Sequence, residues 1–174
     1  MGDDGLGVEV VETLRHMWAP DPDLVFLDGG TWGMRVLPYI ESARRLLLLD
    51  VIRDGQDPGA LIRLERDELP RHLKQKLSPH QIDLSEVLAL AELRGTFPED
   101  AVALGIEPEV VELHDGLSET VKATVPELIE AVRDQLEAWG HTLEPAERGH
   151  TGGPRARATA PGRPDGRVQE SPDA

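Results

Sequence analysis

Residues 45–52 read RLLLLDVI, and this stretch decides the fold. Four consecutive leucines make an extended chain apolar on both faces. Strands of this kind are typical of a sheet that helices cover on both sides. We therefore expect residues 45–52 to form a central strand of such a sheet.

Helical and strand patterns alternate around this stretch. Four segments carry apolar residues at helical spacing: 5–17, 34–40, 84–93 and 119–139. Three further short runs have the composition of strands: 24–27, 60–65 and 101–106. Ser118 is a good N-cap for the last helix, and Pro38 is expected to interrupt the second. Strands separated by helices predict a three-layer α/β/α sandwich around a mostly parallel twisted sheet.

The composition changes near Pro145. Before it, residues 1–145 are long enough for one domain. After it, residues 146–174 are dominated by Gly, Pro, Arg, Ala and Thr, and they contain few apolar side chains. Such a segment buries too little surface to offset its ordering entropy, so we predict a disordered tail.

Composition and charge exclude several classes of protein. The sequence has no cysteine, which rules out disulfides, thiolate nucleophiles and Cys-ligated metal centres. Its net charge of −15 disfavours nucleic acid as a partner. No apolar run approaches the roughly 20 residues that span a bilayer, and no signal peptide is recognisable. We expect a cytoplasmic protein.

Four positions could carry chemistry at the carboxyl ends of the predicted strands, where open α/β sheets bind ligands. Asp50 ends the apolar strand, where a charge is costly unless it is paired or bound to a metal. Asp28 leads into a glycine turn. Asp4 precedes the first helix, and a helix cap is its alternative role. His80 lies between a loop and a helix, and a capping or surface histidine is its alternative.

Known catalytic motifs are absent: the sequence contains no HExxH, GxSxG, P-loop or GxGxxG pattern. Two carboxylates and one imidazole remain, and such a set suits nickel, zinc or iron with open coordination positions. Spacing does not establish that these side chains meet. The residues alone therefore indicate an acidic α/β domain with potential metal ligands.

Several segments, in order, resemble the hydrogenase maturation protease family. They are MGDDGLGV (1–8), LDGGTWGM (27–34), LLLLD (46–50), SPHQ (78–81), GIEPE (105–109) and GLS (116–118). They are similar to the family's GD(D/E)GxGxxV turn, DGGTxG turn, aspartate-terminated strand, SPHQ element, G(V/I)xPE segment and GLS segment. The resemblance spans residues 1 to about 140.

The resemblance implies both an activity and a site. Members remove a C-terminal extension from the large subunit of nickel–iron hydrogenase after nickel insertion, and they are classed by convention as aspartic-type endopeptidases. Three positions correspond to the nickel-binding and catalytic residues: Asp4, Asp50 and His80. Asp28, with Gly29 and Gly30, is expected to help position the peptide. The implied partner is the nickel-loaded precursor, with nickel belonging to that substrate, and the implied state is a monomer.

The start of the sequence differs from the family pattern. Members begin with an apolar strand and a GxGN turn, about a dozen residues before the position of Met1. The resemblance therefore implies that the first strand is missing here. An alternative function follows, a non-catalytic nickel-sensing or maturation-binding protein that is inactive without this strand. A generic hydrolase or phosphate-binding domain is a third hypothesis, which the absent P-loop and the acidic charge disfavour.

Overall fold

The computed structural model describes residues 3–19, 21–29, 33–69, 84–109 and 116–146. In these ranges, three strands form one mixed sheet: β1 (Arg45–Val51), β2 (Leu61–Glu65) and β3 (Asp100–Ile106). β3 lies in the middle, with β1 parallel to it on one side and β2 antiparallel on the other. The paired residues include Asp50 with Gly105.

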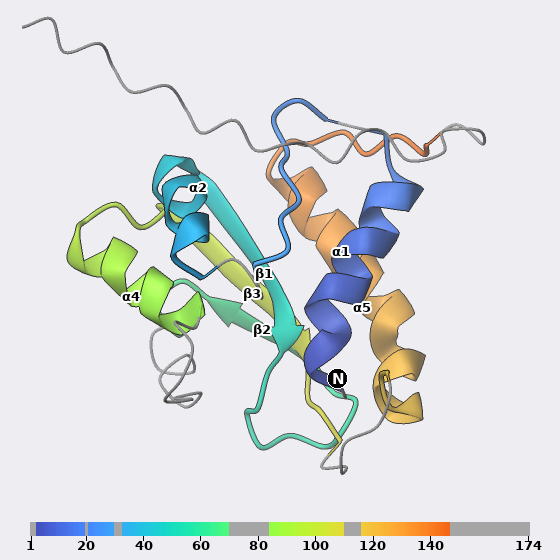
Figure 1. Cartoon of the computed structure of the whole chain (residues 1–174). Helices are drawn as coiled ribbons and strands as arrows, with labels where there is room; N and C mark the ends of the chain where they lie inside the picture. Colours follow the sequence, from blue (N-terminus) through green and yellow to red (C-terminus); the bar gives the residue numbers. More distant parts are fainter. Residues whose placement is uncertain (1–2, 20, 30–32, 70–83, 110–115, 147–174) are drawn as a thin grey trace, which may run out of the picture.

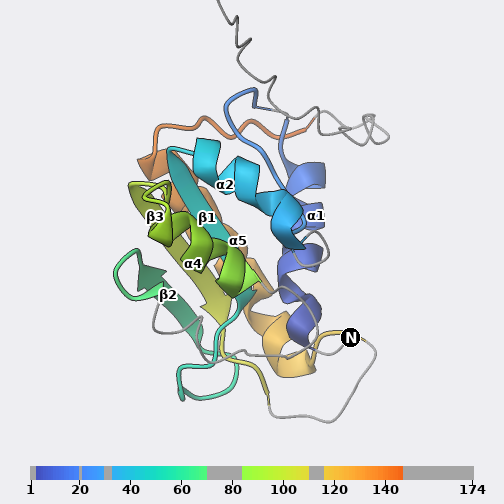
Figure 2. The same ribbon diagram turned by 60° about the vertical axis from the view of Figure 1, so that its left-hand side comes forward.

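Helices cover both faces of the sheet, as expected for a three-layer α/β/α arrangement (Figures 1 and 2). One layer contains α1 (Leu6–Met17), which follows the short 3₁₀ turn η1 (Asp3–Gly5), and α5 (Glu119–Ala138). The other contains η2 (Gly33–Val36), α2 (Leu37–Ser42) and α4 (Leu84–Leu93). Within the described residues, no helix is long and apolar enough to cross a membrane.

The leucines of β1 serve both layers. Leu47 and Leu49 pack against the core that α1 and α5 form, whereas Leu46 and Leu48 pack against the side of α2 and α4. The prediction that both faces are covered is confirmed. The prediction that this strand is central is wrong for the described sheet, because β1 pairs only with β3 and lies at an edge. β3 takes the central position, and its residues are buried from Ala101 onward. A missing strand before Met1 stays a prediction.

The strand predicted at residues 24–27 does not form. This segment has no ladder partner among the described residues, so four consecutive apolar side chains alone do not make it a strand. Leu24 and Phe26 still pack against the core, and Val25 is 65% exposed.

The carboxylate of Asp21 accepts a hydrogen bond from the His141 ring at 3.0 Å, which holds the pKa of Asp21 below its ordinary value.

The remaining helix predictions are confirmed, with one adjustment. Ser118 caps α5, and its Oγ accepts the N–H of Val121 at 3.3 Å. Pro38 lies in the first turn of α2, where its missing N–H has no helical role, so it starts the helix instead of interrupting it.

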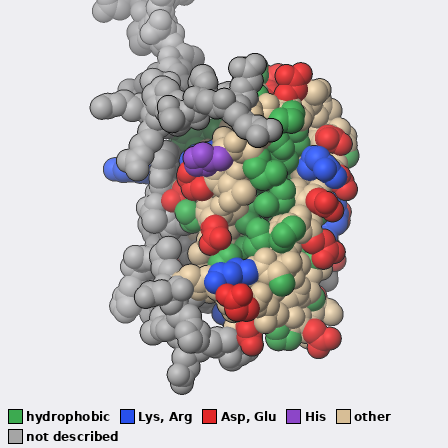
Figure 3. Space-filling view, turned by 90° about the vertical axis from the view of Figure 1, so that its right-hand side faces the viewer, with side chains coloured by type: hydrophobic (Ala, Val, Ile, Leu, Met, Phe, Trp, Pro, Cys, Tyr) green, Lys and Arg blue, Asp and Glu red, His purple; other side chains and the backbone are tan. Residues whose placement is uncertain are grey.

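On the face formed by α1 and α5, a band of apolar side chains runs between acidic and basic ones (Figure 3).

The first turn of α1 lies unusually close to β1. A Cβ atom on Gly7 would stand 2.3 Å from the carbonyl oxygen of Leu49 and 3.8 Å from the Cα of Asp50. Side-chain carbon atoms do not approach a backbone oxygen so closely. Only glycine therefore allows the helix to lie on the strand at this depth.

We predict that Gly7→Ala destabilises the protein, although alanine is the better helix former. Helix propensity alone favours alanine by about 1 kcal/mol. Crowding against a backbone carbonyl reverses the sign, and we expect a net loss of about 1–3 kcal/mol in the free energy of unfolding. Urea denaturation followed by circular dichroism measures it.

Gly5→Ala is the matched control, because a Cβ there meets nothing within 4 Å. Its expected cost is below about 1 kcal/mol, since it only replaces an N-cap glycine. A Gly7→Ala protein as stable as wild type would show that α1 does not depend on this contact.

Candidate functional site

Asp4 does not cap the first helix. The N-cap of α1 is Gly5, and no side chain makes a capping hydrogen bond there. Asp4 is exposed, and its carboxylate has no hydrogen bond or ion pair with another described residue. The alternative role considered for Asp4 is thus wrong, and at the start of α1 stands a carboxylate that no other described residue engages.

The neighbouring Asp3 has the structural role instead. Its Oδ1 accepts the backbone N–H of Ser118 at 2.7 Å, and its Oδ2 accepts the Ser118 hydroxyl at 3.1 Å. Oδ2 also accepts the N–H of Glu109 at 3.2 Å. Asp3 therefore ties η1 to the segment after β3 and to the N-terminus of α5. Sequence reasoning missed this role, because nothing in an aspartate doublet distinguishes its two members.

Asp50 is the penultimate residue of β1, at the carboxyl end of the parallel pair. It is half-buried, and its Oδ1 accepts the N–H of Val51 at 2.8 Å among its contacts. Its neighbour on β3 is Gly105, where a Cβ would lie 2.2 Å from the Asp50 carbonyl oxygen. Gly105 thus leaves room for the backbone of Asp50.

The structure brings the turn that carries Asp4 beside Asp50. η1 contacts β1, and Gly7, three residues after Asp4, packs directly on Leu49 and Asp50. The N-terminal turn and the carboxyl end of β1, which are far apart in the sequence, therefore lie in one region (Figure 1). Their proximity was not predictable from spacing.

Asp28 lies in the loop that leads to η2, and it is half-buried with interactions of its own. The adjacent Gly29 faces the first residue of α4, since a Cβ there would lie 4.0 Å from Cδ1 of Leu84. Gly30 and His80 lie outside the described residues. Within those residues, no three His, Cys, Asp or Glu side chains form a metal-binding group. The structure therefore places two of the three predicted ligands.

A profile of the hydrogenase maturation protease family matches residues 8–135. The chain belongs to this family. The matched range contains Asp28, Asp50 and His80 and begins after Asp4. It makes the protein a peptidase of the hydrogenase maturation endopeptidase kind.

Individual relatives support the assignment. The chain is 38% identical over 140 residues to the hydrogenase expression/formation protein HoxM of Cupriavidus necator, covering 79% of this chain and 69% of HoxM. It is 34% identical to the hydrogenase 2 maturation protease of Escherichia coli, covering 85% and 91% of the two chains. The solved structure of the E. coli hydrogenase maturating endopeptidase HYBD is similar, with a TM-score of 0.76, 33% identity, and coverage of 83% and 90%.

We predict unequal stability effects for the two adjacent aspartates. Asp3→Ala leaves the N–H groups of Ser118 and Glu109 without their acceptor, so the free energy of unfolding should fall by about 1–3 kcal/mol. Asp4→Ala removes no described contact and should change it by less than about 0.5 kcal/mol. Thermal and urea unfolding of both variants measure the difference. Equal losses would mean that Asp4 also supports the fold.

Proposed function

We propose that this chain is the endopeptidase that removes the C-terminal extension of a nickel–iron hydrogenase large-subunit precursor after nickel insertion. The observation that carries the proposal is an exposed carboxylate, Asp4, without a described partner, in a turn that contacts β1, the strand that carries Asp50 near its carboxyl end. Family membership and the hydrogenase 2 maturation protease of E. coli support the type of substrate.

The donor set fits a nickel ion that arrives with the substrate. Asp4, Asp50 and His80 together offer two carboxylates and one imidazole, ligands that suit a borderline divalent ion. Three protein ligands leave coordination positions for groups of the precursor. Recognition of the metal in place then makes cleavage conditional on nickel insertion.

Hydrolysis of the peptide bond requires a water molecule to lose a proton and the carbonyl oxygen to gain stabilisation. A carboxylate of the site accepts the proton, which accords with the aspartic-type class of the family. Bound nickel supplies Lewis-acid character at the same place. Asp28 and the adjacent Gly29 line the approach and orient the peptide chain.

We further propose that the enzyme is a cytoplasmic monomer that acts on a protein substrate. Neither nucleic acid nor membrane is its partner. The net charge of −15 is compatible with a partner of basic or metal-bearing surface. The alternative, a nickel-sensing or maturation-binding protein without catalysis, makes a different prediction for the same assay.

We predict that Asp4→Asn, Asp50→Asn and His80→Gln each reduce processing of nickel-loaded precursor by at least about 100-fold, the size of effect seen when a key polar group of an active site is lost. Asp4→Asn and Asp50→Asn keep the shape and hydrogen-bonding capacity of the side chain while removing its charge. His80→Gln keeps a polar side chain while removing the imidazole. Purified enzyme and precursor are incubated together, and the size shift of the large subunit is followed on a gel.

Asp134→Asn is the control, since it makes the same chemical change on the exposed surface of α5, where the carboxylate is 70% exposed. It should process at the wild-type rate. Precursor without nickel should remain uncut by every variant. Equal cleavage of both precursor forms would contradict nickel recognition, and binding without any cleavage by wild type would favour the non-catalytic alternative.

A further inference from the structure

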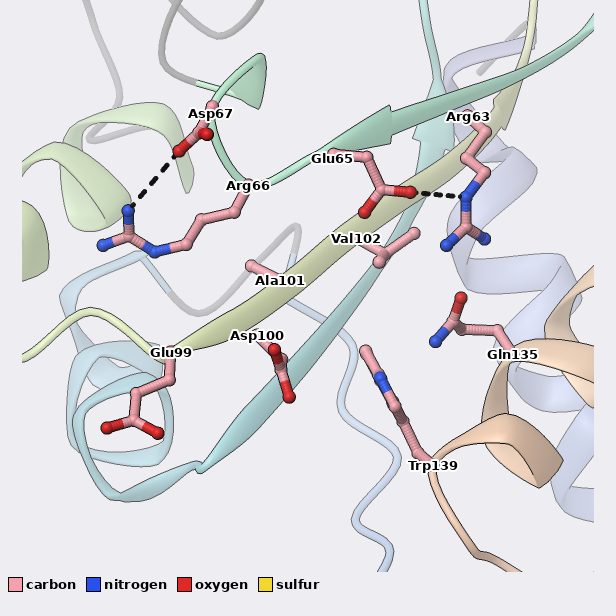
Figure 4. Close-up of a pocket in the computed structure, with 10 residues that line it drawn as sticks. All are labelled: Arg63, Glu65, Arg66, Asp67, Glu99, Asp100, Ala101, Val102, Gln135 and Trp139. Carbon is pink, nitrogen blue, oxygen red and sulfur yellow. Dashed lines mark hydrogen bonds and ion pairs between the residues drawn. The ribbon is translucent and has the colours of Figure 1, made fainter.

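A second site lies at the opposite end of the sheet from Asp50. A hollow of about 190 Å³ opens between the start of β3, the end of β2 and the last turns of α5 (Figure 4). Its base is formed by Ala101 and Val102, and Trp139 and Gln135 form the side contributed by α5 and its C-cap. None of these residues belongs to the site at Asp4 and Asp50.

The side chain of Gln135 indicates that this hollow accepts a ligand. Gln135 is only 8% exposed, and its side chain extends from α5 toward the hollow (Figure 4). Within the described part of the chain, its amide group has no hydrogen-bond partner. Buried side-chain amides are nearly always hydrogen-bonded, because leaving one without a partner is costly. A bound polar group would satisfy it.

The charges around the hollow favour a cation. Its lining contains four carboxylates and two guanidiniums, a formal net charge of −2. Both arginines are engaged, Arg63 with Glu65 at 2.7 Å and Arg66 with Glu92 at 3.2 Å. Glu99 has no ion pair with another described residue and is left to meet an incoming charge.

The size of the hollow favours one side chain over a cofactor. Pockets for drug-sized ligands usually enclose about 300–1,000 Å³, and this one is smaller. Among cationic side chains, a guanidinium matches it best. It offers five donors in a planar fork, which suits an amide carbonyl and a carboxylate together. Arg45 of this chain already lies over the Trp139 ring at 5.8 Å and pairs with Asp100 at 3.3 Å, so the incoming guanidinium is left the Gln135 carbonyl and Glu99.

We propose that this hollow binds the guanidinium of an arginine side chain, and that the large-subunit precursor presents this arginine. The identification of the precursor as the source of this arginine rests on the proposed function. The hollow is then a docking point remote from the cleavage site, and it contributes to the affinity for the precursor without taking part in the chemistry.

The first experiment tests binding without any catalysis. Nitrogen-15-labelled protein is titrated with N-acetyl-arginine amide, and N-acetyl-citrulline amide serves as the uncharged probe of nearly the same shape. We expect the side-chain amide signals of Gln135 and the indole signal of Trp139 to shift with the arginine probe only. Gln135→Leu identifies the amide signals by their absence, and it should abolish the indole shift. Equal shifts with both probes would overturn the proposal. So would the absence of any shift at about 100 mM probe, a concentration that half-saturates even a site with a Kd of about 100 mM.

The second experiment tests the precursor as the source of the arginine. We expect Gln135→Leu and Glu99→Gln each to raise KM for the nickel-loaded precursor about five-fold or more, an effect of roughly 1 kcal/mol or more, while kcat stays at the wild-type value. Glu130→Gln, the same chemical change at an exposed position of α5 outside the hollow, should leave both constants unchanged.

The outcomes separate this inference from the proposed function. Normal processing with an unchanged KM in both hollow variants would overturn the precursor as the ligand and leave the protease function standing. A wild-type chain that shifts with the arginine probe but cleaves no precursor would contradict the protease function and support the guanidinium site. A fall in kcat alone would also overturn a purely binding role.

Discussion

The close contact between α1 and β1 is the constraint on which the candidate site depends. Because Gly7 has no side chain, the first turn of α1 can lie directly on the carbonyl of Leu49 and the Cα of Asp50. The same approach sets the depth at which α1 joins the apolar core through Leu6, Val10 and Leu14. One glycine thereby couples packing on a sheet face to the position of the acidic turn that precedes the helix.

Two adjacent aspartates have different surroundings at this turn. Asp3 accepts hydrogen bonds from Ser118 and Glu109, and so fixes the turn to α5 and to the segment after β3. Asp4 is exposed and makes no described contact, so its charge remains available. Because Asp3 accepts the hydrogen bonds that hold this turn, the fold does not require the carboxylate of Asp4.

The two ends of the sheet differ in chemistry. At the carboxyl end of β1, where a parallel α/β pair normally binds ligands, Asp50 lies in a strand that the turn with Asp4 contacts. At the other end, β2 runs antiparallel to β3 and α5 terminates, which leaves a small polar hollow lined by Gln135 and Trp139. In the proposed function, the protein substrate contacts both ends at once only if it spans the length of the sheet.

The sequence by itself determined the helices, the strands at 45–52, 60–65 and 101–106, and the covered sheet, because apolar periodicity reports local burial directly. Its motif order also determined the family. Three features were decided only by tertiary structure: the edge position of β1, the coil at residues 24–27, and the different roles of Asp3 and Asp4. Strand order and hydrogen-bond partners depend on which distant segments meet, and local periodicity carries no information about those meetings. The side-chain amide of Gln135, which has no hydrogen-bond partner among the described residues, is likewise a feature that only tertiary structure decides. It is buried only because α5 packs over the start of β3.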